Sequence, residues 1–182
     1  MSRRVLHTCL LALAALLIAG LNTAYAQTGS YTPTAQNGGT AYLAPSGKAK
    51  IANGIAIPPA DAPPQVVAMI NAANAISTKP YRYGGGHAKF EDSAYDCSGS
   101  ESYALHGANL IDRPMDSSEF MSWGEPGEGT WITSYANSGH SFLVVAGLRF
   151  DTGYNNSTSS GPKWSDQMRP TGSYTARHPE GL

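Results

Sequence analysis

The sequence predicts an α+β fold in which helices come first and an antiparallel run of strands follows. Apolar residues recur at helical spacing from Val66 to Ile76, and the stretch that begins at Cys97 is expected to form a second helix. The run from His140 to Gly147 is the most strand-like in the chain, with β-branched residues and enough continuity for a central strand. This order of elements is typical of the α+β class.

The first 26 residues have the features of an export signal. Arg3 and Arg4 form a basic start, Val5 to Leu21 is an almost unbroken apolar run, and Ala24-Tyr25-Ala26 supplies small residues for a signal peptidase. A retained membrane anchor is the alternative, but the apolar run is short for a stable span. We therefore expect residues 1–26 to be a signal peptide. The protein would then be secreted, to the periplasm or cell wall, with no stable membrane insertion.

Charge and cysteine content restrict the function classes. Removing residues 1–26 takes two Arg and no acid from the 12 basic and 13 acidic residues, which leaves 10 against 13, or −3. That balance excludes the electrostatic footprint of a nucleic-acid binder. Of the two cysteines only Cys97 would remain, so no intrachain disulfide can form and the core must hold the fold. We expect a monomer.

Residues 27–64 are rich in Gly, Ala, Thr, Asn and Pro and poor in large apolar side chains. Such a composition favours a flexible linker, because it buries too little surface to offset the entropy of ordering. The alternative is an edge strand formed by Ile51, Ile55 and Ile57. The folded domain is expected to span 65–182.

Two helices are expected in the first half of this domain. Asp61 and Pro64 suit the start of the first helix, and Pro80 ends its pattern. A glycine-rich stretch, 80–86, leads towards the second helix, which is expected to run from Cys97 to about His106 with Gly107 as its stop.

A short third helix and the strands follow. Asp116-Ser117-Ser118-Glu119 has the pattern of a capping box. Strands are expected at 130–135, 140–147 and 148–152, with a last short strand at 173–178. The second and third of these strands would form a hairpin around Gly147-Leu148.

Three residues in this arrangement could form a nucleophilic site. Cys97 would lie at a helix N-terminus, where the helix dipole and free N–H groups stabilise a thiolate. His140 opens the central strand, and the predicted hairpin brings Asp151 back beside it. A nucleophilic thiol needs a base, and the base needs a group to orient it. The alternatives are a buried structural cysteine, a surface histidine and a turn aspartate.

The motifs around these residues resemble a known family. PYRYGGG, YDCSG, GHSFLVVAG and RFDT, within about 66–152, are similar to motifs of NlpC-type cell-wall cysteine peptidases. The resemblance implies a minimal papain-like fold, with the nucleophile at a helix N-terminus packed on a central antiparallel sheet. It also implies an exported bacterial enzyme that hydrolyses amide bonds in peptidoglycan stem peptides, commonly between D-glutamate and diaminopimelate.

Carried over by residue, the resemblance makes Cys97 the nucleophile, His140 the base and Asp151 the orienting residue. Tyr81 would line the site and assist in binding. The expected substrate-binding residues are Tyr81, Tyr83, Gly85, His87, Asp96 and Ser98. No cofactor is expected. A metal site formed by Cys97 and histidines lacks the close ligand spacing of such sites, so no metal is expected.

This chain departs from the family pattern at three places. The third catalytic residue is more often His, and the loop 86–96 is longer than usual. Gly99-Ser100-Glu101 replaces an apolar pair, with Glu101 expected to face the groove or solvent. The segment 161–182 lies outside the motif and could pack on the sheet or line the site. Rival functions are an N-acetylmuramoyl-L-alanine amidase, an acyltransferase on the same fold, and a non-catalytic wall-binding module.

Overall fold

A computed structural model describes residues 47–153 and 161–182 of the chain. The predicted signal peptide, 1–26, and the first part of the predicted linker lie outside these residues. None of the helices in the described part is long and apolar enough to cross a membrane.

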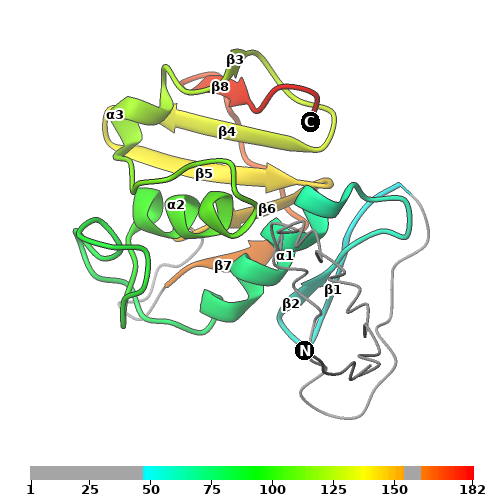
Figure 1. The fold of residues 1–182 in the computed structure, drawn as a ribbon, viewed down its shortest axis with the longest axis horizontal. Coiled ribbons are helices and arrows are strands. Elements are labelled where there is room, and N and C mark those ends of the chain that lie inside the picture. Colours follow the sequence, from blue (N-terminus) through cyan, green and yellow to red (C-terminus); the bar gives the residue numbers. More distant parts are fainter. Residues whose placement is uncertain (1–46, 154–160) are drawn as a thin grey trace, which may run out of the picture. The chain divides into compact units, whose positions relative to one another are not determined.

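The fold is built on a six-stranded antiparallel sheet with the strand order β3-β8-β4-β5-β6-β7 (Figure 1). The strands are β3 (Glu125–Pro126), β4 (Ile132–Asn137), β5 (His140–Val145), β6 (Leu148–Asp151), β7 (Lys163–Ser165) and β8 (Thr175–His178). The expected α+β class is therefore present, with β5 in the interior of the sheet. The first predicted strand lies two residues later in the chain than expected.

Within residues 47–153 and 161–182, three helices accompany the sheet: α1 (Pro64–Ile76), α2 (Cys97–Gly107) and α3 (Ser117–Phe120). α1 and α2 pack against each other, and α2 also contacts β5 and β6 (Figure 1). Pro63 precedes α1 and Pro64 opens it, which is the favoured position for proline because the first N–H groups have no helical partner. The predicted capping box at Asp116 and Glu119 is confirmed.

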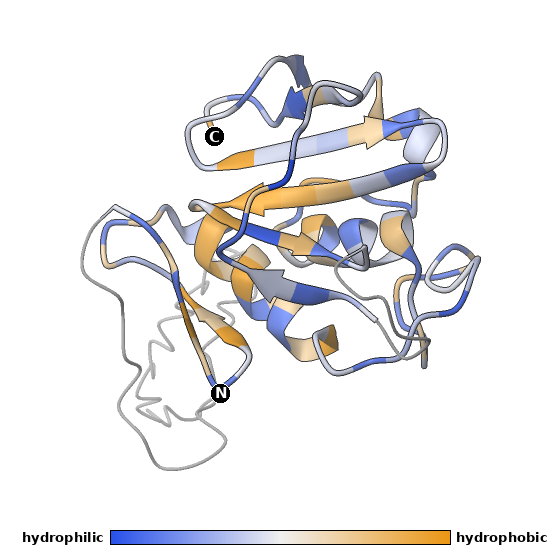
Figure 2. Ribbon diagram, turned by 180° about the vertical axis from the view of Figure 1, so that it is seen from behind, coloured by the Kyte–Doolittle hydropathy of each residue, from blue (hydrophilic) through white to orange (hydrophobic). Residues whose placement is uncertain are grey.

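The core lies between the helices and one face of the sheet. It contains Val66, Met69 and Ile70 from α1, and Leu143 and Phe150 from the strands. Alternation along a strand sends Leu143 and Val145 into this core, and His140 and Phe142 to the outer face. Along its length, β5 also changes from hydrophilic at its start to hydrophobic at its end (Figure 2).

The last part of the predicted linker, 27–64, is not an unstructured tether. Lys50–Ala52 (β1) and Ile55–Ile57 (β2) form a separate two-stranded sheet, joined by Asn53 and Gly54 at positive φ. The backbone of Ala56 exchanges two hydrogen bonds with the Asn74 side chain of α1, at 2.9 and 2.8 Å. These two hydrogen bonds hold β2 against α1, although the segment is poor in large apolar groups.

Gly107 was expected to stop the second helix but is its last residue, and Ala108 is the C-cap. Its role is close packing: a Cβ atom there would lie 2.3 Å from the Cβ of Ala72 on α1. The positive φ that ends this region belongs to Asn109 instead. The glycine therefore allows α1 and α2 to approach each other.

The C-terminal segment 161–182 both packs on the sheet and reaches the site. β7 pairs with β6, whereas β8 pairs with β4, so the connection between them has to pass β5 and β6. It crosses on the outer face, because Tyr174 contacts the rings of His140 and Phe142 there. Figure 2 shows this crossing in front of the sheet. β7 had not been predicted.

Candidate active site

The Cys97 thiol lies at the first residue of α2 and is half-buried. Asp96 is the N-cap, and its Oδ1 accepts a hydrogen bond of 2.8 Å from the N–H of Gly99. Asp96 Oδ2 accepts a second bond, also of 2.8 Å, from the N–H of Gly84 in the glycine-rich loop. The same carboxylate therefore starts the helix and holds the loop that precedes it.

Tight backbone contacts fix this junction. A Cβ atom on Gly99 would lie 1.9 Å from the carbonyl oxygen of Gly85, and one on Gly85 would lie 2.4 Å from the carbonyl oxygen of Ala94. The N–H of Asp96 also donates to the Gly85 carbonyl, at 3.2 Å. Only glycine fits at these two contacts, so the motif glycines shape the backbone around Cys97.

His140 and Asp151 meet through the β5–β6 hairpin. The hairpin turns at Ala146 and Gly147, both at positive φ, and pairs Val145 with Leu148. A two-residue turn of this kind fixes the register. His140 and Asp151 then share the outer face, with His140 Nε2 2.8 Å from Asp151 Oδ1.

Asp151 is 1% exposed, and both of its carboxylate oxygens lie against hydrogen-bond donors. Oδ1 also accepts from the Gly153 N–H at 2.8 Å, and Oδ2 accepts from Arg149 Nε at 2.9 Å. Arg149 is itself 3% exposed and lies over the Phe142 ring, 3.5 Å from its centroid. Asp151 therefore faces two cationic groups, His140 and a buried guanidinium.

The contacts of His140 favour its protonated form. Burial lowers the pKa of His140, but hydrogen bonds to Asp151 and Cys97 and the charges of both groups outweigh burial and raise that pKa to about 10. Since Nε2 is directed at Asp151, Nδ1 is the nitrogen available to Cys97. A protonated imidazole beside a thiol stabilises the reactive thiolate.

Asp151 is ionised for the complementary reason. Burial raises the pKa of Asp151, but the hydrogen bond and charge of His140, the charge of Arg149 and the Gly153 N–H together lower it below its ordinary value. An ionised acid that accepts from Nε2 holds the imidazole in one orientation. Sequence reasoning missed Arg149, although its position two residues before Asp151 on a strand already places both on one face.

Cys97 and His140 each line a concave region of the surface. A groove of about 350 Å³ contains Cys97 and is lined by the glycine-rich loop, the start of α2, the start of α3 and the β4–β5 turn, with Tyr83, His87, Asp96, Ser98, Asp116 and Ser138 among its residues. A recess of about 430 Å³ contains His140 and is lined by Arg149, Gly153, Arg169, Pro170, Ser173 and Tyr174. The groove is bordered by acids and hydroxyls, and the recess by arginines.

The predicted substrate-binding residues divide between the groove and its supporting backbone. Tyr83 is 89% exposed on the rim of the groove. Gly85 is a backbone support, as described above, and the carboxylate of Asp96 is buried and used as a cap. Burial raises the pKa of the Tyr81 phenol, and the charge of Cys97 raises it further. Tyr81 is therefore close to the thiol.

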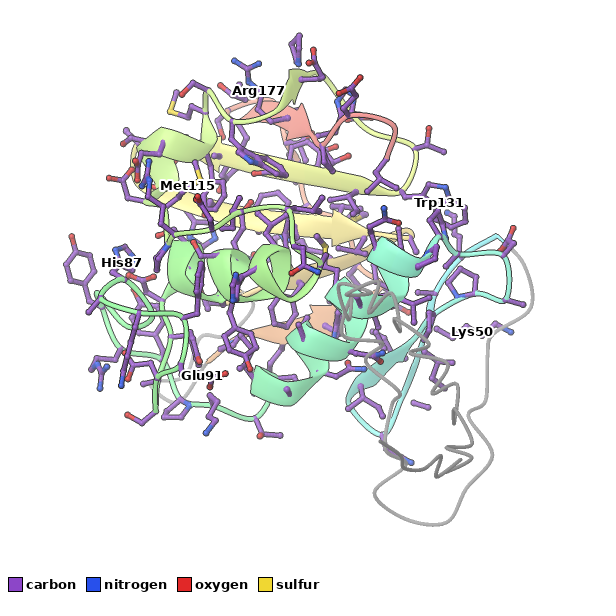
Figure 3. The ribbon with its side chains drawn as sticks, in the orientation of Figure 1. Lys50, His87, Glu91, Met115, Trp131 and Arg177 are labelled. Atoms are coloured by element: carbon purple, nitrogen blue, oxygen red, sulfur yellow. The ribbon has the colours of Figure 1, made fainter. Side chains whose placement is uncertain are left out.

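His87 and Ser98 lie in the groove and contact each other. His87 Nε2 is 2.9 Å from Asp96 Oδ1 and 3.1 Å from Ser98 Oγ. Both contacts use the same ring nitrogen, so the imidazole does not relay a proton between the hydroxyl and the carboxylate. Figure 3 shows His87 on the loop before α2, at the edge of the molecule where β5 begins.

Glu101 differs from its expected position. It faces neither groove nor solvent: it is 1% exposed, one helical turn after Cys97 and among polar residues of β4 and β5. No group of three or more His, Cys, Asp or Glu side chains in the described part of the chain could hold a metal ion.

No protein-family model matches the chain, and no curated protein matches it. Among solved structures, the peptidoglycan hydrolase RipB from Mycobacterium tuberculosis is similar at 17% sequence identity, with a TM-score of 0.45. The match covers 62% of this chain and 64% of that one, so the chain spans less than two thirds of its neighbour.

Proposed function

We propose that the protein is an exported cysteine-type hydrolase that cleaves amide bonds in peptidoglycan stem peptides. The observation that carries this proposal is the geometry of His140, which contacts Asp151 through Nε2 at 2.8 Å and lies close enough to Cys97 for a hydrogen bond. A thiol, a base and an orienting acid in this order form a nucleophilic unit. The substrate class is supported by the motifs that resemble NlpC-type peptidases.

In the proposed reaction, the Cys97 thiolate attacks the scissile carbonyl carbon and forms a tetrahedral intermediate. The first N–H groups of a helix have no intrahelical acceptor, and Asp96 takes that of Gly99, so those of Cys97 and Ser98 are suited to the oxyanion. Collapse of the intermediate breaks the C–N bond, and His140 gives its proton to the leaving amine. His140 then takes a proton from water, whose oxygen attacks the thioester and releases the acid.

These steps determine the direction in which the substrate binds. The acyl part of the substrate lies in the groove beside Cys97, and the leaving amine lies on the side of His140. The bond between D-glutamate and diaminopimelate is the proposed target, because the resemblance implies it. The acting location is outside the cytoplasmic membrane, as the features of residues 1–26 predict.

Digestion of defined muropeptides, with products identified by mass, tests the proposal. We expect the wild-type protein to release a fragment that ends in D-glutamate, and Cys97→Ser and His140→Ala to lose at least about a thousandfold in rate. His106→Ala is the matched control, because His106 lies at the far end of α2 and should leave the rate unchanged. Release of intact peptide from the sugar would indicate an amidase, and unchanged activity in Cys97→Ser would refute the mechanism.

A further inference from the structure

Glu101 places a carboxyl group directly behind the proposed catalytic pair. It lies four residues after Cys97 on α2, so both side chains project from the same side of the helix. Ser141, the residue after His140, points from β5 into the same interior, because successive strand residues face opposite sides of a sheet. Glu101 thus lies between the two elements that carry the nucleophile and the base.

This carboxyl group is buried without a conventional partner. Within the described residues, neither of its oxygens makes a hydrogen bond of good geometry, and the same is true of the hydroxyls of Ser134 and Ser141. All three side chains are at most 1% exposed. The two hydroxyls are nevertheless near enough to stabilise the charged carboxylate and lower its pKa. Two hydroxyl donors therefore face one acceptor group.

The surrounding charges are those of the catalytic residues. Burial is the main effect on Glu101 and raises its pKa to about 7, while the charge of His140 lowers it and that of Asp151 raises it. On the opposite side, α1 contributes only apolar side chains to the core. Because His140 titrates near 10, Glu101 is charged and His140 is still protonated over an interval above neutral pH.

We propose that Glu101 is a positioning residue for the proposed active site, whose buried carboxylate supplies a negative charge behind His140 and, with Asp151, keeps the imidazole in the protonated form that pairs with the thiolate. This inference rests on the proposed function for its role in catalysis. The effect of Glu101 on the charge of His140 does not depend on the proposed function. Electrostatic coupling is mutual: if protonated His140 favours ionised Glu101, ionised Glu101 favours protonated His140.

The role of Asp151 explains why a second acid is useful. Asp151 shares its charge between His140 and the buried Arg149, so its attraction for the imidazole is partly offset. Glu101 has no such cationic partner other than His140 among the groups that act on it. It approaches from the helix side of the sheet, whereas Asp151 and Arg149 lie on the outer side.

The titration of His140, followed by NMR of its imidazole in the full-length chain, tests the electrostatic part without any substrate. The signal is assigned by its disappearance in His140→Ala. We expect Glu101→Gln to lower the midpoint of His140 by about one pH unit, because the variant cannot ionise. Glu101→Asp keeps the charge and should return the midpoint towards that of the wild type.

Two further variants separate charge from packing. Glu101→Met fills the same space without polarity, and replacement of buried polar groups by apolar ones is often neutral or stabilising. It should show the same lowered midpoint as Glu101→Gln while melting at the same or a higher temperature. Glu180→Gln removes an exposed carboxylate and should leave the midpoint unchanged. An unchanged midpoint in both Glu101→Gln and Glu101→Met would overturn the proposal.

Muropeptide hydrolysis tests the catalytic part. In Glu101→Gln the alkaline limb of kcat against pH should move to lower pH by the same amount as the NMR midpoint, with KM unchanged. A lowered midpoint with an unmoved kcat profile would refute the role in positioning for catalysis. If the wild type itself cleaves no muropeptide, the proposed function fails, while the NMR result still decides whether Glu101 controls the charge of His140.

Discussion

Replacing Glu101 with Gln removes a buried charge while keeping the shape of the side chain, and the effect on stability should depend on pH. The pKa of Glu101 is raised from 4.5 to about 7 in the fold by burial. In the unfolded chain the group ionises near 4.5, so between 4.5 and 7 the folded state holds the proton more tightly. Folding therefore becomes less favourable as pH rises through this interval.

The size of this penalty follows from the shift. At about 1.4 kcal/mol per pKa unit, a shift from 4.5 to about 7 corresponds to roughly 3 kcal/mol of stability, lost progressively above pH 4.5 and fully lost above pH 7. Glu101→Gln has no such penalty. The difference in free energy of unfolding between the variant and the wild type should grow from near zero at pH 4 to roughly 3 kcal/mol at pH 8.

Urea unfolding followed by circular dichroism, at several pH values from 4 to 8, measures this difference directly. Other titrating groups are common to both proteins, so their contributions largely cancel in the comparison. Glu180→Gln, which removes an exposed carboxylate, should show a flat difference over the same range. A constant difference between Glu101→Gln and the wild type would mean that Glu101 titrates normally, and the reasoning from burial would be refuted.

Three other outcomes are expected. Arg149→Met should lower the free energy of unfolding by about 3–5 kcal/mol, because it removes the buried guanidinium that Asp151 Oδ2 contacts; a loss below 1 kcal/mol in urea unfolding would contradict this. Gly99→Ala should slow alkylation of the Cys97 thiol and destabilise the fold, because the added Cβ would lie 1.9 Å from the Gly85 carbonyl oxygen. Gly139→Ala should do neither, because its Cβ would contact only Asn137 Oδ1, at 3.8 Å. kcat/KM on muropeptides should fall as pH rises through about 10, where His140 loses its proton; a fall centred near 6.5 would indicate an unperturbed imidazole.

Local signals were sufficient for the parts of the fold that depend on neighbouring residues. The proline-led start of α1, the capping box at Asp116 and the hairpin from His140 to Asp151 each depend on contacts within about twelve residues. In the hairpin, the alternation of faces and a tight turn together determine which side chains meet. The proximity of His140 and Asp151 could therefore be predicted without knowledge of the rest of the sheet.

The remaining features depend on distant contacts or on weak periodicity. The start of α2 is formed by small and polar residues, so no apolar stripe indicates that Glu101 turns inward. The hairpin β1–β2 is held by Asn74, and the crossing between β7 and β8 is held by Tyr174 on the far side of β5. Hydrogen bonds and ring contacts of this range leave no pattern in the local sequence.

The two acids near His140 affect stability in opposite ways. Asp151 is paired with donors, its pKa is lowered, and its ionised form stabilises the fold above the pKa it has when unfolded. Glu101 lacks a cation of its own, and its ionised form weakens the fold above pH 4.5. A carboxyl group that destabilises its own protein at neutral pH is expected to persist where it serves activity, since active sites trade stability for function.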